Sequence, residues 1–148
     1  MSDSSTELPS VSPMLSYEDV GAAVEWLGRA FGFPERTGQR YTEPDGTVTH
    51  AEVAVGDGVI MLGHPSPDYE GPRKHAEHCE QARKWREPGY VVDGIHVLVD
   101  DVDAHFRWAK SAGATILSEP EDRPYAERVY RVEDIDGHRW MIGQRIPG

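Results

Sequence analysis

The sequence predicts an α+β fold of two tandem β-α-β-β-β modules that form a curved mixed sheet around a central cleft. Three observations predict it: an internal repeat, an amphipathic helix in each copy that starts at an Asp and stops near a Gly, and two apolar runs after each helix. A chain of 148 residues suits one compact domain, or two small modules that share a core.

The repeat emerges when the chain is shifted by 82 positions. The segment LSYEDVGAAVEWLGRAFGF (15–33) then aligns with VLVDDVDAHFRWAKSAGA (97–114). Five of the twelve pairs between positions 19 and 30 are identical: Asp19/Asp101, Val20/Val102, Ala22/Ala104, Trp26/Trp108 and Ala30/Ala112. Because the order of apolar runs after each segment also matches, we interpret the two halves as a duplication.

Each copy opens with a short predicted strand, at 11–17 and at 94–100. An Asp follows that can cap the first turn of a helix. The first helix carries an apolar stripe with a period of 3.6 residues, at Val20, Ala23, Val24, Leu27 and Phe31.

Turn sequences place the remaining strands. PDGT at 44–47 and GDG at 56–58 predict a hairpin of 47–55 with 59–63. The sequence DIDG at 134–137 indicates the equivalent turn in the second copy.

These elements give the expected organisation of the chain. Residues 1–10 are polar and predict a disordered tail. The folded domain spans 11–146, with module one at 11–63, a connector at 64–93 and module two at 94–146. Within the connector, 73–87 has the composition of a single helix that lies on the surface as a lid or connector.

Composition narrows the classes of function. The net charge of −11 repels phosphate groups, which argues against nucleic-acid and anionic-membrane partners. The sequence has no apolar run long enough to cross a bilayer, its N-terminus does not resemble a signal peptide, and its single cysteine cannot form an internal disulfide. We therefore expect a cytoplasmic protein.

Strand alternation predicts one apolar face on each module and one mixed face, with the composition of a ligand cavity. On the mixed face we expect ligand contacts from Met14, Ser16, Met61, Arg139 and Met141. We hypothesise that His50, Glu52 and His96 converge there as catalytic acid–base groups. The same three residues are also compatible with a relocated metal site, or with a solvated sheet rim and a satisfied core histidine.

The segments HVLVDDVDAHFRWAKSAGA and PYAERVYRVEDIDGHRW resemble the vicinal oxygen chelate superfamily of glyoxalase and bleomycin-resistance proteins. The first half resembles a group of uncharacterised glyoxalase-like proteins, and the likeness covers about 11–146. The resemblance implies metal ligands on the first and last strands of each module. Counted along this sequence, those positions are Ser12, Met61, Gly94 and Met141. Since thioethers and glycine are poor partners for hard divalent metals, we expect no metal cofactor.

The leading hypothesis is a homodimeric protein that binds a small organic molecule in the cleft between its modules, without the family metal. The alternative is a metal-dependent lyase, isomerase or dioxygenase of the same superfamily, in which a divalent metal is the cofactor. The sequence leaves open whether the protein is an enzyme. A duplicated ferredoxin-like regulator is a third reading, which the β-α-β-β-β order disfavours.

Overall fold

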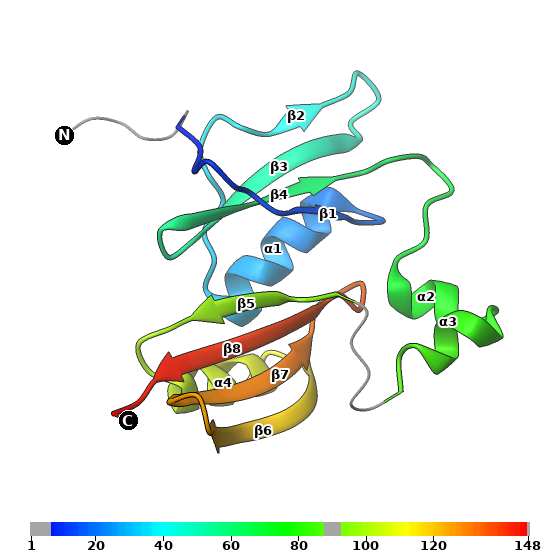
Figure 1. Ribbon diagram of the computed structural model, residues 1–148. Coiled ribbons are helices and arrows are strands. Elements are labelled where there is room, and N and C mark those ends of the chain that lie inside the picture. The colour runs from blue at the N-terminus through cyan, green and yellow to red at the C-terminus, as the bar shows by residue number, and fades with distance from the viewer. Residues whose placement is uncertain (1–6, 88–92, 148) are drawn as a thin grey trace. The chain divides into compact units, whose positions relative to one another are not determined.

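The computed structural model describes residues 7–87 and 93–147. The chain divides into two compact units, residues 1–70 and 71–148, and each holds a four-stranded mixed sheet with one long helix on one face (Figure 1). The predicted α+β class with two β-α-β-β-β modules is therefore confirmed. Most of the predicted tail at 1–10 lies outside the described residues.

The first unit has the strand order β1-β4-β3-β2, with β1 parallel to β4 and the other pairs antiparallel. Its elements are β1 (Met14–Ser16), α1 (Val20–Phe31), β2 (Tyr41–Thr42), β3 (Val48–Val55) and β4 (Gly58–Gly63). The β3–β4 hairpin matches the predicted one to within a residue at each end.

Helix α1 begins and ends as its sequence predicts. The Asp19 side chain accepts a hydrogen bond from the backbone N–H of Ala22 at 3.0 Å, which satisfies one of the open donors of the first turn. Gly32 ends the helix with a φ of 76°, a left-handed conformation that glycine adopts without steric cost. The apolar stripe of the helix covers the β3 side chains Ala51 and Val53, which are fully buried.

The second unit repeats this plan with the strand order β5-β8-β7-β6. Its repeated elements are β5 (Ile95–Leu98), α4 (Val102–Ser111), β6 (Thr115–Arg123), β7 (Glu127–Glu133) and β8 (Arg139–Arg145). Asp101 caps α4 through the N–H of Ala104, as Asp19 caps α1. The buried side chains of the sheet include Tyr130, Trp140 and Ile142, each with no exposed surface.

The connector differs from its prediction. In place of one helix over 73–87, the chain forms α2 (Pro72–Ala76) and α3 (Glu80–Lys84). Cys79 separates them with an extended backbone (φ −130°, ψ 109°), which no continuous helix can contain. The predicted helix end at Pro88–Gly89 lies outside the described residues.

The two repeat-related tryptophans occupy different environments. Trp26 is buried on α1 and packs edge-on against Phe31, with ring centroids 4.9 Å apart. Trp108 on α4 is 63% exposed. The duplication therefore preserves the fold but not the surroundings of each residue. Within the described residues, no helix is both long and apolar enough to cross a membrane.

Candidate functional site

Each sheet has one face covered by the long helix of its unit, α1 or α4. We call the opposite face, which this long helix leaves open, the helix-free face. In the first unit the ladder places Met14 of β1, Met61 of β4 and Glu52 of β3 in one row. Ser16, Gly63 and His50 form the next row. Residues in register share a face, so these side chains lie opposite the buried Ala51 and Val53, as strand alternation predicts.

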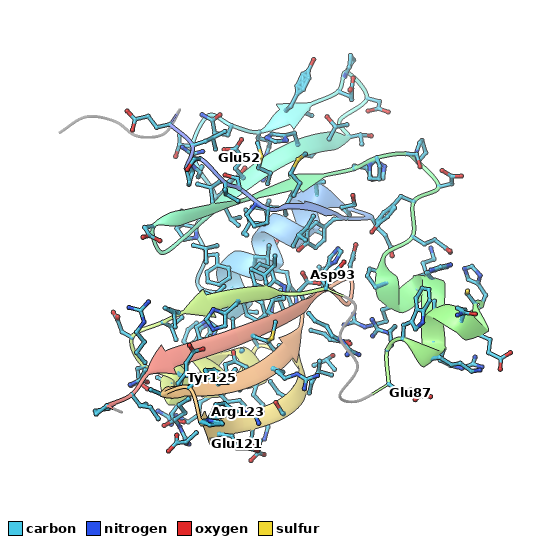
Figure 2. The ribbon with its side chains drawn as sticks, in the orientation of Figure 1. Glu52, Glu87, Asp93, Glu121, Arg123 and Tyr125 are labelled. Carbon is cyan, nitrogen blue, oxygen red and sulfur yellow. The ribbon has the colours of Figure 1, made fainter. Side chains whose placement is uncertain are left out.

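Glu52, which Figure 2 labels, is the centre of a polar cluster on this face. It is only 4% exposed, although it is a carboxylate. One carboxylate oxygen lies 2.9 Å from Nε2 of His50, and the other accepts a hydrogen bond from the guanidinium of Arg36. A buried carboxylate requires such partners, because an unpaired buried charge is strongly unfavourable.

Sequence reasoning did not identify Arg36. It lies in the irregular segment after α1, where its backbone N–H also donates to the carbonyl of Glu52 at 2.8 Å. Its guanidinium extends further to the carbonyl of Glu7. Because only the tertiary fold brings residues 36 and 52 together, no local sequence motif predicts this pair.

The second unit has a matching pair of rows. His96 of β5, Met141 of β8, Arg131 of β7 and Ser118 of β6 lie in register across the whole sheet. In the next row Leu98, Gly143 and Val129 are neighbours. Met141 thus occupies the place in this sheet that Met61 occupies in the first, beside the parallel edge strand.

His96 pairs with a carboxylate that the sequence analysis did not single out. Its Nε2 is hydrogen-bonded to Oε1 of Glu127, which belongs to β7. The Glu127 side chain lies over Gly143, because a Cβ atom built there would collide with that carboxylate. The absence of a side chain at Gly143 is what lets the pair form.

Arg139, predicted to contact a ligand, lies on the expected face but is already engaged. It is 9% exposed, and its Nε donates to Glu133 at 3.2 Å. Arg73 and Arg86 of the connector donate to the same carboxylate. Arg139 therefore holds the connector against the sheet, together with its bond to the carbonyl of Arg86.

The three residues predicted to converge are distributed over the two units. His50 and Glu52 are directly hydrogen-bonded in the first unit, whereas His96 belongs to the second and has Glu127 as its partner. Each histidine is thus paired with a carboxylate of its own sheet. Such a pair fixes the orientation and the tautomer of the imidazole.

The helix-covered face of β7 carries the side chains of Arg128 and Tyr130. Arg128 bonds to Asp103 of α4 at 3.1 Å, and the Tyr130 hydroxyl lies 2.7 Å from Nδ1 of His105. Burial raises the pKa of Tyr130 because its charged form would lose hydration. These groups join α4 to the sheet and take no part in the helix-free face.

The residues at the family's metal positions do not fit a hard divalent ion. Met61 and Met141 lie on the helix-free faces, but they offer thioethers, and the other two positions hold Ser12 and Gly94. Among residues 7–87 and 93–147, no group of three His, Cys, Asp or Glu side chains is placed to hold a metal ion. The donor set at these positions therefore lacks the imidazoles and carboxylates that such a site uses.

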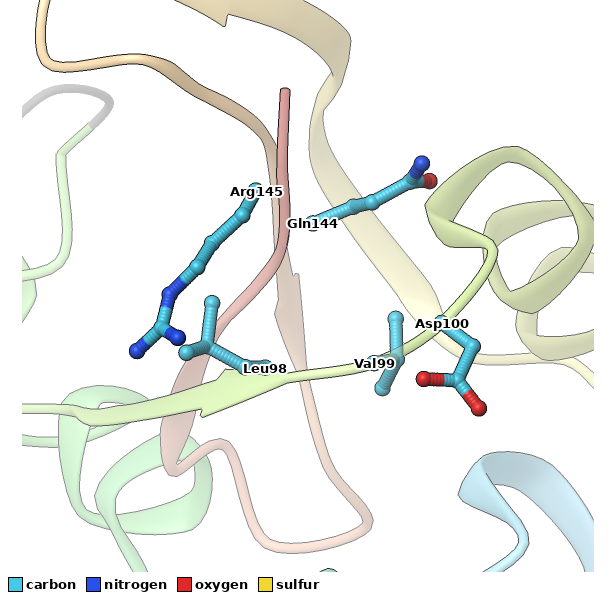
Figure 3. Close-up of a pocket in the computed structure, with 5 residues that line it drawn as sticks. All are labelled: Leu98, Val99, Asp100, Gln144 and Arg145. Atoms are coloured by element: carbon cyan, nitrogen blue, oxygen red, sulfur yellow. The ribbon is translucent and has the colours of Figure 1, made fainter. Parts of the chain in front are cut away.

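A small hollow lies where β5 and β8 end in the second unit (Figure 3). Its volume is about 270 Å³, and its lining residues are Leu98, Val99, Asp100, Gln144 and Arg145. Gln144 already caps α4 by accepting from the N–H of Val102 at 2.9 Å. The hollow is slightly smaller than most ligand pockets, which usually measure about 300–1,000 Å³.

Known proteins are similar to this chain in sequence and in fold. The family model for the Glyoxalase/Bleomycin resistance protein/Dioxygenase superfamily matches residues 11–142. An uncharacterized protein of Mycobacterium bovis is 31% identical over 93% of this chain and 84% of its own. TioX from Micromonospora sp. ML1 is 30% identical with a TM-score of 0.65, over 95% of this chain and 98% of its own.

A more distant structure shows the same fold. The bleomycin resistance determinant encoded on the transposon Tn5 has a TM-score of 0.60 at 16% identity, over 93% of this chain and 98% of its own. The family match covers both modules and agrees with the β-α-β-β-β order of each. This protein belongs to the Glyoxalase/Bleomycin resistance protein/Dioxygenase superfamily.

Proposed function

We propose that this protein binds a small organic molecule against the helix-free faces of its sheets, without a metal at the family positions. The observation that carries the proposal is the pair of thioethers at equivalent places, Met61 and Met141, each at the centre of a mixed row. Ligand sites combine apolar walls with a few placed polar groups. Methionine side chains adapt to ligands of differing shape, which suits binding of an apolar or aromatic body.

The polar groups beside these methionines support the same proposal. Met61 has the buried Glu52 beside it, and Met141 has His96. Both groups are held by hydrogen bonds to neighbours, so their positions are set before a ligand arrives. Preorganised polar groups orient a ligand at a low entropic cost.

Acid–base catalysis is the second candidate function. The specific observation that favours it is the hydrogen bond between His50 and Glu52, in which Arg36 holds the other carboxylate oxygen. That arrangement leaves the second imidazole nitrogen, Nδ1, as a site where a proton can be taken up or released.

Titration with the neutral fluorescent dye Nile red tests the binding proposal. We expect saturable binding by the parent protein, and at least tenfold weaker binding by Met61→Lys or Met141→Lys, because each change replaces the apolar side chain that would contact the ligand with a charged one. Trp108→Lys puts the same charge on the exposed surface of α4 and serves as the control. Unchanged affinity in both methionine variants would overturn the proposal.

A further inference from the structure

We infer that Arg131 and Ser118 form an anion subsite on the helix-free face of the second unit, which takes the carboxylate of a small organic acid. The inference rests on the proposed function and names the class of its ligand. Neither Arg131 nor Ser118 was among the predicted ligand contacts or the histidine–carboxylate pairs, although both lie in the row that holds Met141 and His96.

The position of Arg131 follows from its strand. Its neighbours Tyr130 and Val132 are fully buried on the helix-covered side of β7, so Arg131 points to the helix-free face. In the ladder it lies between Met141 of β8 and Ser118 of β6. Arg131 thus lies on an inner strand of the sheet, partly buried.

The charge of Arg131 is not neutralised locally. Glu133, two residues along the same face, is bonded to Arg73, Arg86 and Arg139. Glu127, further along, is bonded to His96. Arg131 itself has no carboxylate partner in the part of the chain that the structure describes. A guanidinium is a positively charged group with several N–H donors, so an anion is the class of ligand that suits it.

Ser118 supplies the second, independent observation. Its Oγ is buried and has no hydrogen-bond partner among the described residues. Buried hydroxyl groups are normally hydrogen-bonded, and an exception indicates a missing partner. Ser118 is the ladder partner of Arg131, between two register irregularities of the β6–β7 pair, so both side chains lie on the same face of the sheet. We infer that one ligand group can accept from both the Ser118 hydroxyl and the Arg131 guanidinium.

The number of donors and the charge select the ligand. One guanidinium balances a single negative charge and the hydroxyl adds one neutral donor, which favours a carboxylate over a phosphate dianion. The thioether of Met141 and the imidazole of His96 continue the row, so an apolar or aromatic body attached to the carboxylate would lie against them. The net charge of −11 opposes anion binding only weakly here, since ions screen exposed charges beyond about 8 Å.

Two probes with different charges test the inference. The first is 8-anilinonaphthalene-1-sulfonate, an aromatic monoanion, and the second is neutral Nile red. We expect Arg131→Gln to weaken binding of the anionic dye about tenfold and to leave Nile red binding within twofold of the parent. Ser118→Ala should weaken the anionic dye by a smaller factor, about threefold. Arg107→Gln is the matched control, because it removes the same charge from the exposed surface of α4.

A competition experiment with the parent protein keeps the test independent of variant folding. Benzoate should displace the anionic dye at about a tenfold lower concentration than benzyl alcohol, and phenyl phosphate should compete less well than benzoate. Equal competition by benzoate and benzyl alcohol, or equal losses in Arg131→Gln and Arg107→Gln, would overturn the subsite while saturable Nile red binding leaves the proposed function standing. Binding of neither dye by the parent protein would overturn both.

Discussion

Met61 of β4 lies directly opposite Glu52 of β3, so a thioether and a buried carboxylate are neighbours on the helix-free face of the first unit. The residues on either side of Met61, Ile60 and Leu62, are buried on the other face. A single strand therefore contributes to the core with every second residue and to the candidate site with the residues between.

This alternation predicts different costs for two adjacent truncations. Ile60→Ala should lower the free energy of unfolding by about 2–5 kcal/mol, because it leaves a cavity in the core. Met61→Ala should cost clearly less, because its side chain is partly exposed. Urea melts of both variants provide the measurement. Equal large losses would mean that the Met61 face is packed core.

Glu52 should be far more important for stability than an exposed glutamate. Glu52→Ala leaves the guanidinium of Arg36 buried without its carboxylate, and we expect a loss of about 3–5 kcal/mol in the free energy of unfolding. Glu121→Ala is the control (Figure 2), since the Glu121 side chain is 63% exposed in its pair with Arg123 and surface pairs contribute about 0–1 kcal/mol. A loss below 1 kcal/mol at Glu52 would contradict the buried cluster.

The raised pKa of Tyr130 predicts how the free energy of unfolding falls at alkaline pH. Its folded pKa lies above the unfolded value near 10, so the folded chain keeps a proton that the unfolded chain releases. Its contribution is therefore complete below pH 10 and is lost at about 1.4 kcal/mol per pH unit above it. Tyr130→Phe should show a shallower decline between pH 10 and 11 in denaturant melts. Parallel declines in parent and variant would contradict this assignment.

The donor set at the family's metal positions predicts the metal content. Protein purified without chelators should contain well below one Zn, Ni, Mn or Fe per chain by elemental analysis, because Ser12, Met61, Gly94 and Met141 do not hold such ions. Near-stoichiometric metal would favour the metal-dependent enzyme instead. If His50→Ala or His96→Ala abolished it, the metal would lie at the histidines.

We also expect a homodimer in solution. Each four-stranded sheet ends in two edge strands, and pairing or coverage of such edges protects them from aggregation. Light scattering at micromolar concentration should give twice the chain mass of 16.5 kDa. A value equal to one chain would refute the expectation.

Local patterns were sufficient to predict most elements of the two modules, though not the positions of β2 and β6. The Asp caps, the helix end at Gly32 and the turn of the β3–β4 hairpin depend on residues that are close in sequence. The periodicity of the apolar residues in each helix and strand is likewise visible in the sequence. The connector was less predictable, because its composition suits a helix while the backbone at Cys79 is extended.

The partners in the candidate site depend on register between distant segments. Arg36 lies 16 residues from Glu52, and His96 lies 31 residues from Glu127. Strand alternation located one member of each pair but had no means of choosing the other. Strand alternation likewise could not single out Arg131. Among the described residues it has no carboxylate partner, and this depends on which side chains the folded sheet places beside it.

Methyl NMR of methionine tests the central claim most directly. The chain has four methionines, of which Met14, Met61 and Met141 lie on the helix-free faces and Met1 begins the sequence. In protein labelled at the methionine methyl carbons, titration with Nile red and with benzoate should shift the Met61 and Met141 signals saturably. Single substitutions assign the four signals. If neither compound moves the Met61 or Met141 signal while the protein remains folded, the helix-free faces do not bind small organic molecules of this kind.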